Sequence, residues 1–309
     1  MSSIGSRLRK SALPVCLALG GFVGLARADT LTAKLYGDNV LLYELIVVRV
    51  ELHLDDAFLP PEVLDDPYEA NRQLWRLRRR LRIELRRPEG EKVCDGILPL
   101  EFPRPTEPVR VLANTGFAFL GRADPKTDEF HHWAEAGIFK LVVVDEEHGL
   151  KSNEMSITLE VPPASELEAS RLFKECGLDA IAPLLGEQPQ HAQSIELLHR
   201  LGENHVETVY GKYATASLAL CRSSKTRREH NDKGGREVWE PVADELARAA
   251  KRFEPPHPVL AKLLFELATA QGLAGQRAEA RQAAETLSSE FPDTEFGRKA
   301  KAMLAKSPD

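Results

Sequence analysis

A change of pattern at Pro162-Pro163 divides the chain into two parts that favour different secondary structure. Before the two prolines, apolar and polar residues alternate with a period of two in several segments, which is the pattern of half-buried β-strands. After them, alanine, leucine and glutamate dominate and β-branched residues become sparse, which favours α-helices. We therefore expect a multidomain β + α protein, with strands in residues 29–162 and helices in residues 163–309.

The alternation is clearest in residues 40–54. One expected face holds Ile46, Val48, Val50, Leu52 and Leu54, and the other holds Leu45, Val47, Arg49 and Glu51. Further strands are expected at 80–87, 109–112, 116–120, 138–145 and 155–161, the last two forming a hairpin. Residues 62–78 have a helical or irregular pattern and interrupt the series. Short strands separated by turns predict an antiparallel β-sandwich.

Three stretches carry a family resemblance. They are the run at 40–52, the strand that ends in RPEG at 87–90, and AGIFKL at 136–141 followed by LKSNE at 150–154. Together they resemble an immunoglobulin-like (Ig-like) module of exported bacterial proteins. The cysteine pair and core tryptophan of antibody domains are absent. The resemblance implies an Ig-like fold over residues 29–162 and implies no activity.

In the second part, Ser165 and Glu168 fit a capping box that would begin the first helix. Further helices are expected at 191–202, 207–222, 237–253, 258–273, 276–290 and 294–305, with a polar loop at 223–236. Residues 261–294 place apolar and small side chains on two helices, with Gly275 between them. This stretch resembles a degenerate tetratricopeptide repeat (TPR). Because one such unit cannot bury its apolar face alone, the resemblance implies an α-helical hairpin array, a TPR-like solenoid.

The first 28 residues have the features of a signal peptide. A basic start precedes an apolar segment at 12–25, and Ala26 and Ala28 form an A-x-A cleavage site. We therefore expect export to the periplasm or the cell exterior, with retention as a membrane anchor as the alternative. No apolar run of 18 residues follows, so no transmembrane span is expected after cleavage.

The charge balance bears on the class of partner. Without residues 1–28, the chain has 37 basic and 47 acidic residues, a net charge of −10. Nucleic-acid binders need clustered positive charge, so we expect no nucleic-acid partner. The one basic run includes Arg78, Arg80, Arg82 and Arg86, which could bind an anionic glycan or simply charge a strand edge.

Three cysteines remain after export, and Cys176 and Cys221 could pair. The alternative is that they and Cys94 are buried thiols. No cysteine motif for zinc or redox chemistry is present.

No catalytic, metal-binding or cofactor-binding set emerges. His131 and His132 follow Asp124 and Glu129, but adjacent residues of a strand point to opposite faces, so a polar loop is the preferred interpretation. The leading hypothesis is an exported, non-enzymatic scaffold of the cell envelope with a protein or peptide partner. Its partner groove would be lined by Tyr210, Tyr213, Trp239 and Arg248. The alternatives are an enzyme or accessory subunit acting on an envelope glycan or peptide, and an anionic-glycan-binding module.

Overall fold

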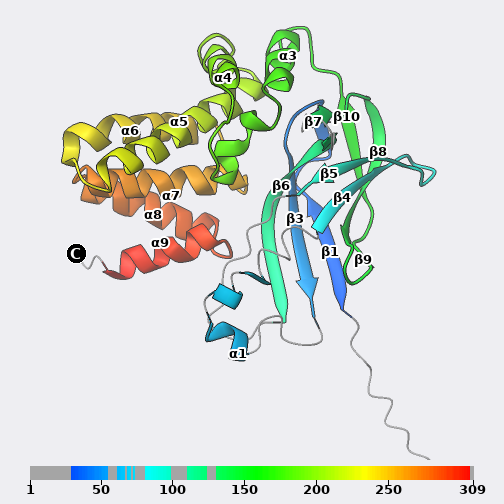
Figure 1. Cartoon of the computed structure of the whole chain (residues 1–309), viewed down its shortest axis with the longest axis horizontal. Helices are drawn as coiled ribbons and strands as arrows, with labels where there is room; N and C mark the ends of the chain where they lie inside the picture. The colour runs from blue at the N-terminus through cyan, green and yellow to red at the C-terminus, as the bar shows by residue number, and fades with distance from the viewer. Residues whose placement is uncertain are drawn as a thin grey trace, which may run out of the picture.

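The computed structural model describes residues 29–54, 61–66, 68–70, 72–73, 81–98, 110–123 and 130–306. A curled sheet is followed by helices that stack along the side where β3 and β6 lie (Figure 1). The strands are β1 (Thr30–Leu35), β2 (Asn39–Leu41), β3 (Ile46–His53), β4 (Leu81–Arg86), β5 (Lys92–Ile97), β6 (Val111–Ala123), β7 (Phe130–His132), β8 (Gly137–Asp145), β9 (Leu150–Lys151) and β10 (Met155–Glu160). The helices are α1 (Pro61–Leu64), α3 (Leu167–Cys176), α4 (Ala192–Asn204), α5 (Val209–His230), α6 (Gly235–Ala250), α7 (Pro258–Leu273), α8 (Arg277–Glu290) and α9 (Glu295–Lys306), with 3₁₀ turns η1 (Gly177–Ala180) and η2 (Ala182–Leu185).

The predicted antiparallel, Ig-like sandwich is wrong. The described strands form one mixed sheet in the order β1-β3-β6-β5-β4-β8-β10-β2, and β2 runs parallel to β10. The reason lies in β6, a single 13-residue strand where the sequence predicted two. Its first part pairs with β3, and Phe119 and Leu120 then pair with β5. Hydrogen bonding therefore continues where a sandwich would have a gap, and the sheet curls into a half-barrel. The coarser prediction, strands followed by helices, holds.

The curl brings β1, at one end of the strand order, against β8 and β9. There Asn153 takes the place of a neighbouring strand. Its amide oxygen accepts a hydrogen bond from the Ala33 N–H and its amide nitrogen donates to the Ala33 carbonyl, both at 3.0 Å. Because these two backbone groups of the edge strand β1 are already hydrogen-bonded, they are not available for pairing with another chain.

The alternation predicted for β3 and β4 is confirmed. On β3, the side chains expected to share one face, Ile46, Val48, Val50 and Leu52, are buried in the core of the curled sheet. On β4, Leu81, Ile83 and Leu85 alternate in the same way and belong to the same core. Leu45 faces the other way and is also buried, because helices cover that side of the sheet. The predicted hairpin of β8 and β10 also forms, and the connection between the two strands contains the short strand β9, which pairs with β8.

Each helix from α3 to α9 packs against the next one along the chain, and Figure 1 shows α5 to α9 as stacked layers.

Two local predictions about the helical part are wrong. Ser165 and Glu168 make no capping box, because α3 begins at Leu167 without a side-chain cap. The polar loop expected at 223–236 is mostly helix, because α5 continues to His230, where basic residues in the last turn favour a helix C-terminus. The resemblance to tetratricopeptide repeats stays a prediction.

Among the described residues, no helix is both long enough and apolar enough to cross a bilayer.

Candidate functional site

The strongest candidate site lies where the sheet meets the helices. Residues 41–45, which we call the junction turn, link β2 to β3 and reverse the chain through Tyr43, whose φ is +71°. Leu45 and, from β6, Phe119 belong to the apolar core of the helices, whereas Leu42 belongs to that of the sheet. Tyr43 packs against both cores. The junction turn therefore joins the two parts of the protein through buried side chains.

Tyr210 on α5 fixes the junction turn by a hydrogen bond. Its side chain is fully buried, and its hydroxyl donates to the Leu42 carbonyl at 2.5 Å. Burial raises the pKa of Tyr210 far above its usual range, so the hydroxyl stays protonated and remains a donor. Its ring also lies 5.5 Å from that of Phe173 on α3. One side chain thus connects the sheet with two helices.

Glu44 is the charged member of the junction turn. Its carboxylate accepts a hydrogen bond from the Leu41 N–H at 3.1 Å. Burial raises the pKa of Glu44, while the Leu41 bond and the positive charge of Lys212 oppose that shift. Glu166, near the start of α3, adds to the raised pKa and itself accepts from the Val209 N–H at 3.1 Å. The site therefore holds two carboxylates that accept hydrogen bonds from backbone N–H groups, Glu44 within the junction turn and Glu166 at the start of α5.

A small hollow adjoins the junction turn. Its lining includes Tyr43, Glu44, Phe119 and Trp133, and the Trp133 Nε1 is buried with no hydrogen-bond partner among the described residues. The hollow has room for about one water molecule. An organic substrate would not fit in this space.

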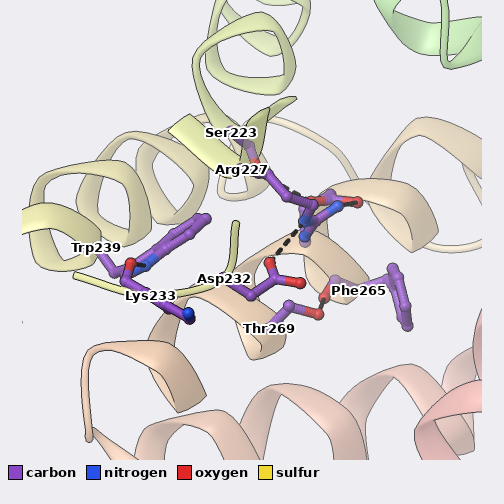
Figure 2. Close-up of polar contacts among 8 residues, drawn as sticks. Ser223, Arg227, Asp232, Lys233, Trp239, Phe265 and Thr269 are labelled. Atoms are coloured by element: carbon purple, nitrogen blue, oxygen red, sulfur yellow. Dashed lines mark hydrogen bonds and ion pairs between the residues drawn. The ribbon is translucent and has the colours of Figure 1, made fainter. Parts of the chain in front are cut away.

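A second polar cluster lies within the helices (Figure 2). Arg227 on α5 donates to Glu266 on α7 at 3.0 Å and to Asp232 in the following loop at 3.2 Å. Ser223 donates to the same Glu266 oxygen at 2.8 Å, and the Trp239 indole N–H donates to the loop carbonyl of Lys233 at 2.7 Å. Ser223 is only 1% exposed, so its hydroxyl cannot reach a substrate. The cluster holds α5, the loop and α7 together.

The four residues predicted to line a partner groove differ in their solvent exposure. Tyr210, Tyr213 and Trp239 are among the largest fully buried side chains and belong to the helical core. Arg248 on α6 is exposed, and its Nε points to the Asp244 carbonyl of the same helix. The structure therefore does not bring these four residues together on one surface, and a partner could reach only Arg248.

The predicted anion patch falls partly outside the described residues, because Arg78 and Arg80 are not among them. Arg82 and Arg86 both lie on β4, and each is paired with a carboxylate: Arg82 with Glu146 at 3.4 Å, and Arg86 with Glu84. These partners offset the positive charge that an anionic glycan would need.

His131 and His132 lie on β7, one exposed and the other turned toward the helices. Asp124 and Glu129 lie outside the described residues, as do Ala26 and Ala28 of the predicted cleavage site. In the part of the chain that the structure describes, no group of three or more potential ligand side chains could hold a metal ion.

The three cysteines of the described chain are free thiols, so Cys176 and Cys221 do not form the disulfide considered above. Burial raises the pKa of Cys94 and of Cys221 to about 11, and that of Cys176 to about 12. At neutral pH all three remain protonated and are weak nucleophiles.

Comparison with known proteins gives no family for the chain: no family model matches it, and neither does any curated protein.

Sequence reasoning missed the junction turn. One signal was present, because Glu44 is the only charged residue between Val40 and Val48. A charge inside an otherwise apolar run indicates that the run does not continue as one buried strand. The charged neighbours of Glu44 are Lys212 on α5 and Glu166 just before α3, more than 100 residues away, and no local pattern could indicate them.

The junction gives a first prediction. Tyr210→Phe removes only the hydroxyl and leaves the buried Leu42 carbonyl without its donor, which costs about 1–3 kcal/mol of unfolding free energy. Urea denaturation of the purified protein measures this loss. The matched control is Tyr68→Phe, because Tyr68 is 79% exposed and its replacement should leave the urea midpoint unchanged. Equal midpoints for Tyr210→Phe and wild type would refute the role assigned to the hydroxyl.

Proposed function

We propose that the protein is an exported, non-enzymatic scaffold of the cell envelope that holds a protein or peptide partner. The observation that carries this proposal is the shared core at the junction turn. Leu45 and Phe119 of the sheet lie in the core of the helices, and Tyr210 of the helices is hydrogen-bonded to Leu42. A scaffold needs surfaces that keep a constant relative position, and burial on this scale supplies it.

The helical part supports the same proposal. Successive stacking of α3 to α9 presents an extended surface, as helical interaction modules do. The aromatic side chains Tyr210 and Tyr213 of α5 and Trp239 of α6 are buried in the core. The binding surface therefore consists of outward-facing residues such as Arg248. The signal-like residues 1–28 support the periplasm or the cell exterior as the location.

Site-specific photo-crosslinking in the native host tests the proposal. A photoreactive amino acid replaces Arg248 on α6 in one variant and Ser156 on β10 in another, both at exposed positions. We expect one envelope protein to be captured at one of these positions and to copurify stoichiometrically with the tagged, uncrosslinked protein. Capture should also fall when the purified pair is competed with unlabelled scaffold.

Two other results would contradict the scaffold proposal. If neither position captures a protein and the purified chain turns over an envelope glycan or peptide, the scaffold proposal is refuted in favour of an enzyme. Binding of an anionic glycan that weakens steeply with salt would favour the third possibility, a glycan-binding module.

A further inference from the structure

Two partly buried histidines share a chemical setting, one packed on the junction turn and one linked to it through a series of aromatic rings. His132 on β7 meets the rings of Phe119 and Tyr43 edge-on, at 4.8 and 5.5 Å between centroids. The Lys174 ammonium on α3 lies 5.4 Å above the same Tyr43 ring. Both ring nitrogens of His132 are shielded from solvent. An added proton would therefore be placed next to a lysine and away from water.

His257, just before α7, repeats this arrangement. Its ring packs 4.9 Å from that of Phe253 and 5.8 Å from that of Tyr213. The Lys212 ammonium on α5 lies 5.3 Å above Tyr213 and 5.6 Å above Phe253. Here, too, a lysine lies over the same aromatic rings that enclose the imidazole.

The hydrogen bonds of His257 define its protonation state. Its Nδ1 accepts from the Val259 N–H at 3.2 Å, so this nitrogen carries no proton. The proton of the neutral ring is therefore on Nε2, which donates to the Tyr213 hydroxyl at 3.1 Å. A second proton would go onto Nδ1 and turn it into a donor facing the Val259 N–H. Protonation thus removes the cap at the start of α7.

Both histidines connect to the junction turn. His132 packs on Tyr43, which is part of that turn. His257 connects through successive rings: Tyr213 lies 6.2 Å from Phe173, and Phe173 lies 5.5 Å from Tyr210, which holds Leu42. A charge on either ring would therefore disturb the packing that joins the sheet to the helices.

We propose that this junction is an acid-sensitive device, in which protonation of His132 and His257 loosens the contact of the junction turn with α3 and α5. This proposal goes beyond the proposed scaffold function and does not depend on it.

The pKa values of the two histidines give the direction in which pH changes the stability of the junction. Burial lowers the pKa of His132 to about 4 and that of His257 to about 3, with Lys174 and Lys212 contributing respectively. A hydrogen bond to the backbone of Lys174 opposes the shift at His132, and exposed His131 adds slightly to it. An opened junction would have histidines of pKa about 6.5. The stabilisation is therefore complete above pH 6.5, declines progressively as the pH falls below that value, and is gone once the pH is below about 3.

Glu44 acts in the opposite direction. It faces Lys212 and Glu166, and its raised pKa means that the closed junction binds its proton more readily than an opened one. Acid therefore stabilises the junction through Glu44 and destabilises it through the histidines. Variants of the histidines separate the two effects.

Hydrogen exchange of the full chain at pH 7.5 and 4.5, corrected for intrinsic rates, tests the proposal. Peptides covering residues 39–46 and 207–214 should lose tenfold or more of their protection at pH 4.5, whereas peptides from β8 and β10 should not. His257→Asn keeps a capping oxygen without a titrating ring, and His132→Gln keeps a polar group. Each should retain more protection at pH 4.5 than wild type, and the double variant should retain the most.

The matched control is His131→Gln on the same strand, at an exposed position. It should behave like wild type at both pH values. Equal junction protection at pH 7.5 and 4.5 in wild type overturns the proposal, and so does an acid-induced loss that persists unchanged in the double variant. If His257→Asn fails to fold at pH 7.5, the wild-type comparison and His132→Gln still decide the matter.

Discussion

Gly211→Ala should destabilise the protein by about 3 kcal/mol or more, because α5 begins where there is no room for a side chain. A Cβ at Gly211 would lie 1.9 Å from the His205 carbonyl oxygen and 3.0 Å from the Val206 Cα. Neither neighbour is a flexible side chain. One of them must move by more than an ångström, or the helix must start elsewhere.

The backbone near Gly211 is held in place by the N-cap of α5. The Thr208 hydroxyl donates to the His205 carbonyl at 2.7 Å and accepts from the Gly211 N–H at 3.0 Å. Moving either segment breaks a cap of about 1 kcal/mol and displaces Tyr210, the neighbour that holds the junction turn. The cost of the clash is therefore added to the loss of both contacts.

Urea denaturation, followed by far-ultraviolet circular dichroism, measures the effect of Gly211→Ala. The control is Gly272→Ala in α7, where an added Cβ meets nothing within 4 Å. There alanine should stabilise the helix by about 0.5–1 kcal/mol. An unchanged midpoint for Gly211→Ala would show that the start of α5 differs from the one described.

The same arrangement occurs at α9 and offers an independent check. Thr294 caps that helix, and a Cβ at Gly297 would lie 2.0 Å from the Phe291 carbonyl oxygen. Because α9 is the last described helix, Gly297→Ala should unfold it locally before the rest. Faster hydrogen exchange confined to residues 295–306 is the expected result.

Strands β3 and β6 show how much of the fold can be predicted from the sequence. The alternation at Ile46, Val48 and Val50 is local, and it correctly predicted the buried face. In contrast, Asn114 marks a turn by local rules, but in the structure it pairs with Val50 across the strand ladder. Long-range pairing overrode the turn signal and changed a two-sheet sandwich into one curled sheet.

The candidate site was less predictable, since aromatic residues at helical spacing fit both a groove and a core. Tyr213 illustrates the ambiguity: its partners are Phe173 on α3, and Phe253 and His257 ahead of α7. Whether such a ring is buried depends on where distant helices pack, which periodicity within one helix cannot show. Arg248, on the same helix as Trp239, is exposed, and its place in a partner groove stays a prediction.

Trp239→Ala distinguishes these two roles, and it should cost about 3–5 kcal/mol of unfolding free energy. Trp239 is fully buried on α6, and its replacement would leave a large cavity in the helical core. It would also leave the Lys233 carbonyl without the indole N–H that now donates to it at 2.7 Å. That bond holds the loop containing Asp232, to which Arg227 donates, so the loop should become more open to proteases.

The urea midpoint and limited proteolysis between α5 and α6 together measure the effect of Trp239→Ala. Trp239→Phe keeps most of the apolar volume and should recover more than half of the loss, while Arg248→Ala on the same helix should stay within about 0.5 kcal/mol of wild type. A groove residue would behave differently, because its removal would weaken partner binding and leave stability intact. Wild-type stability in Trp239→Ala would therefore contradict the burial of this side chain and leave a role in partner binding open to it.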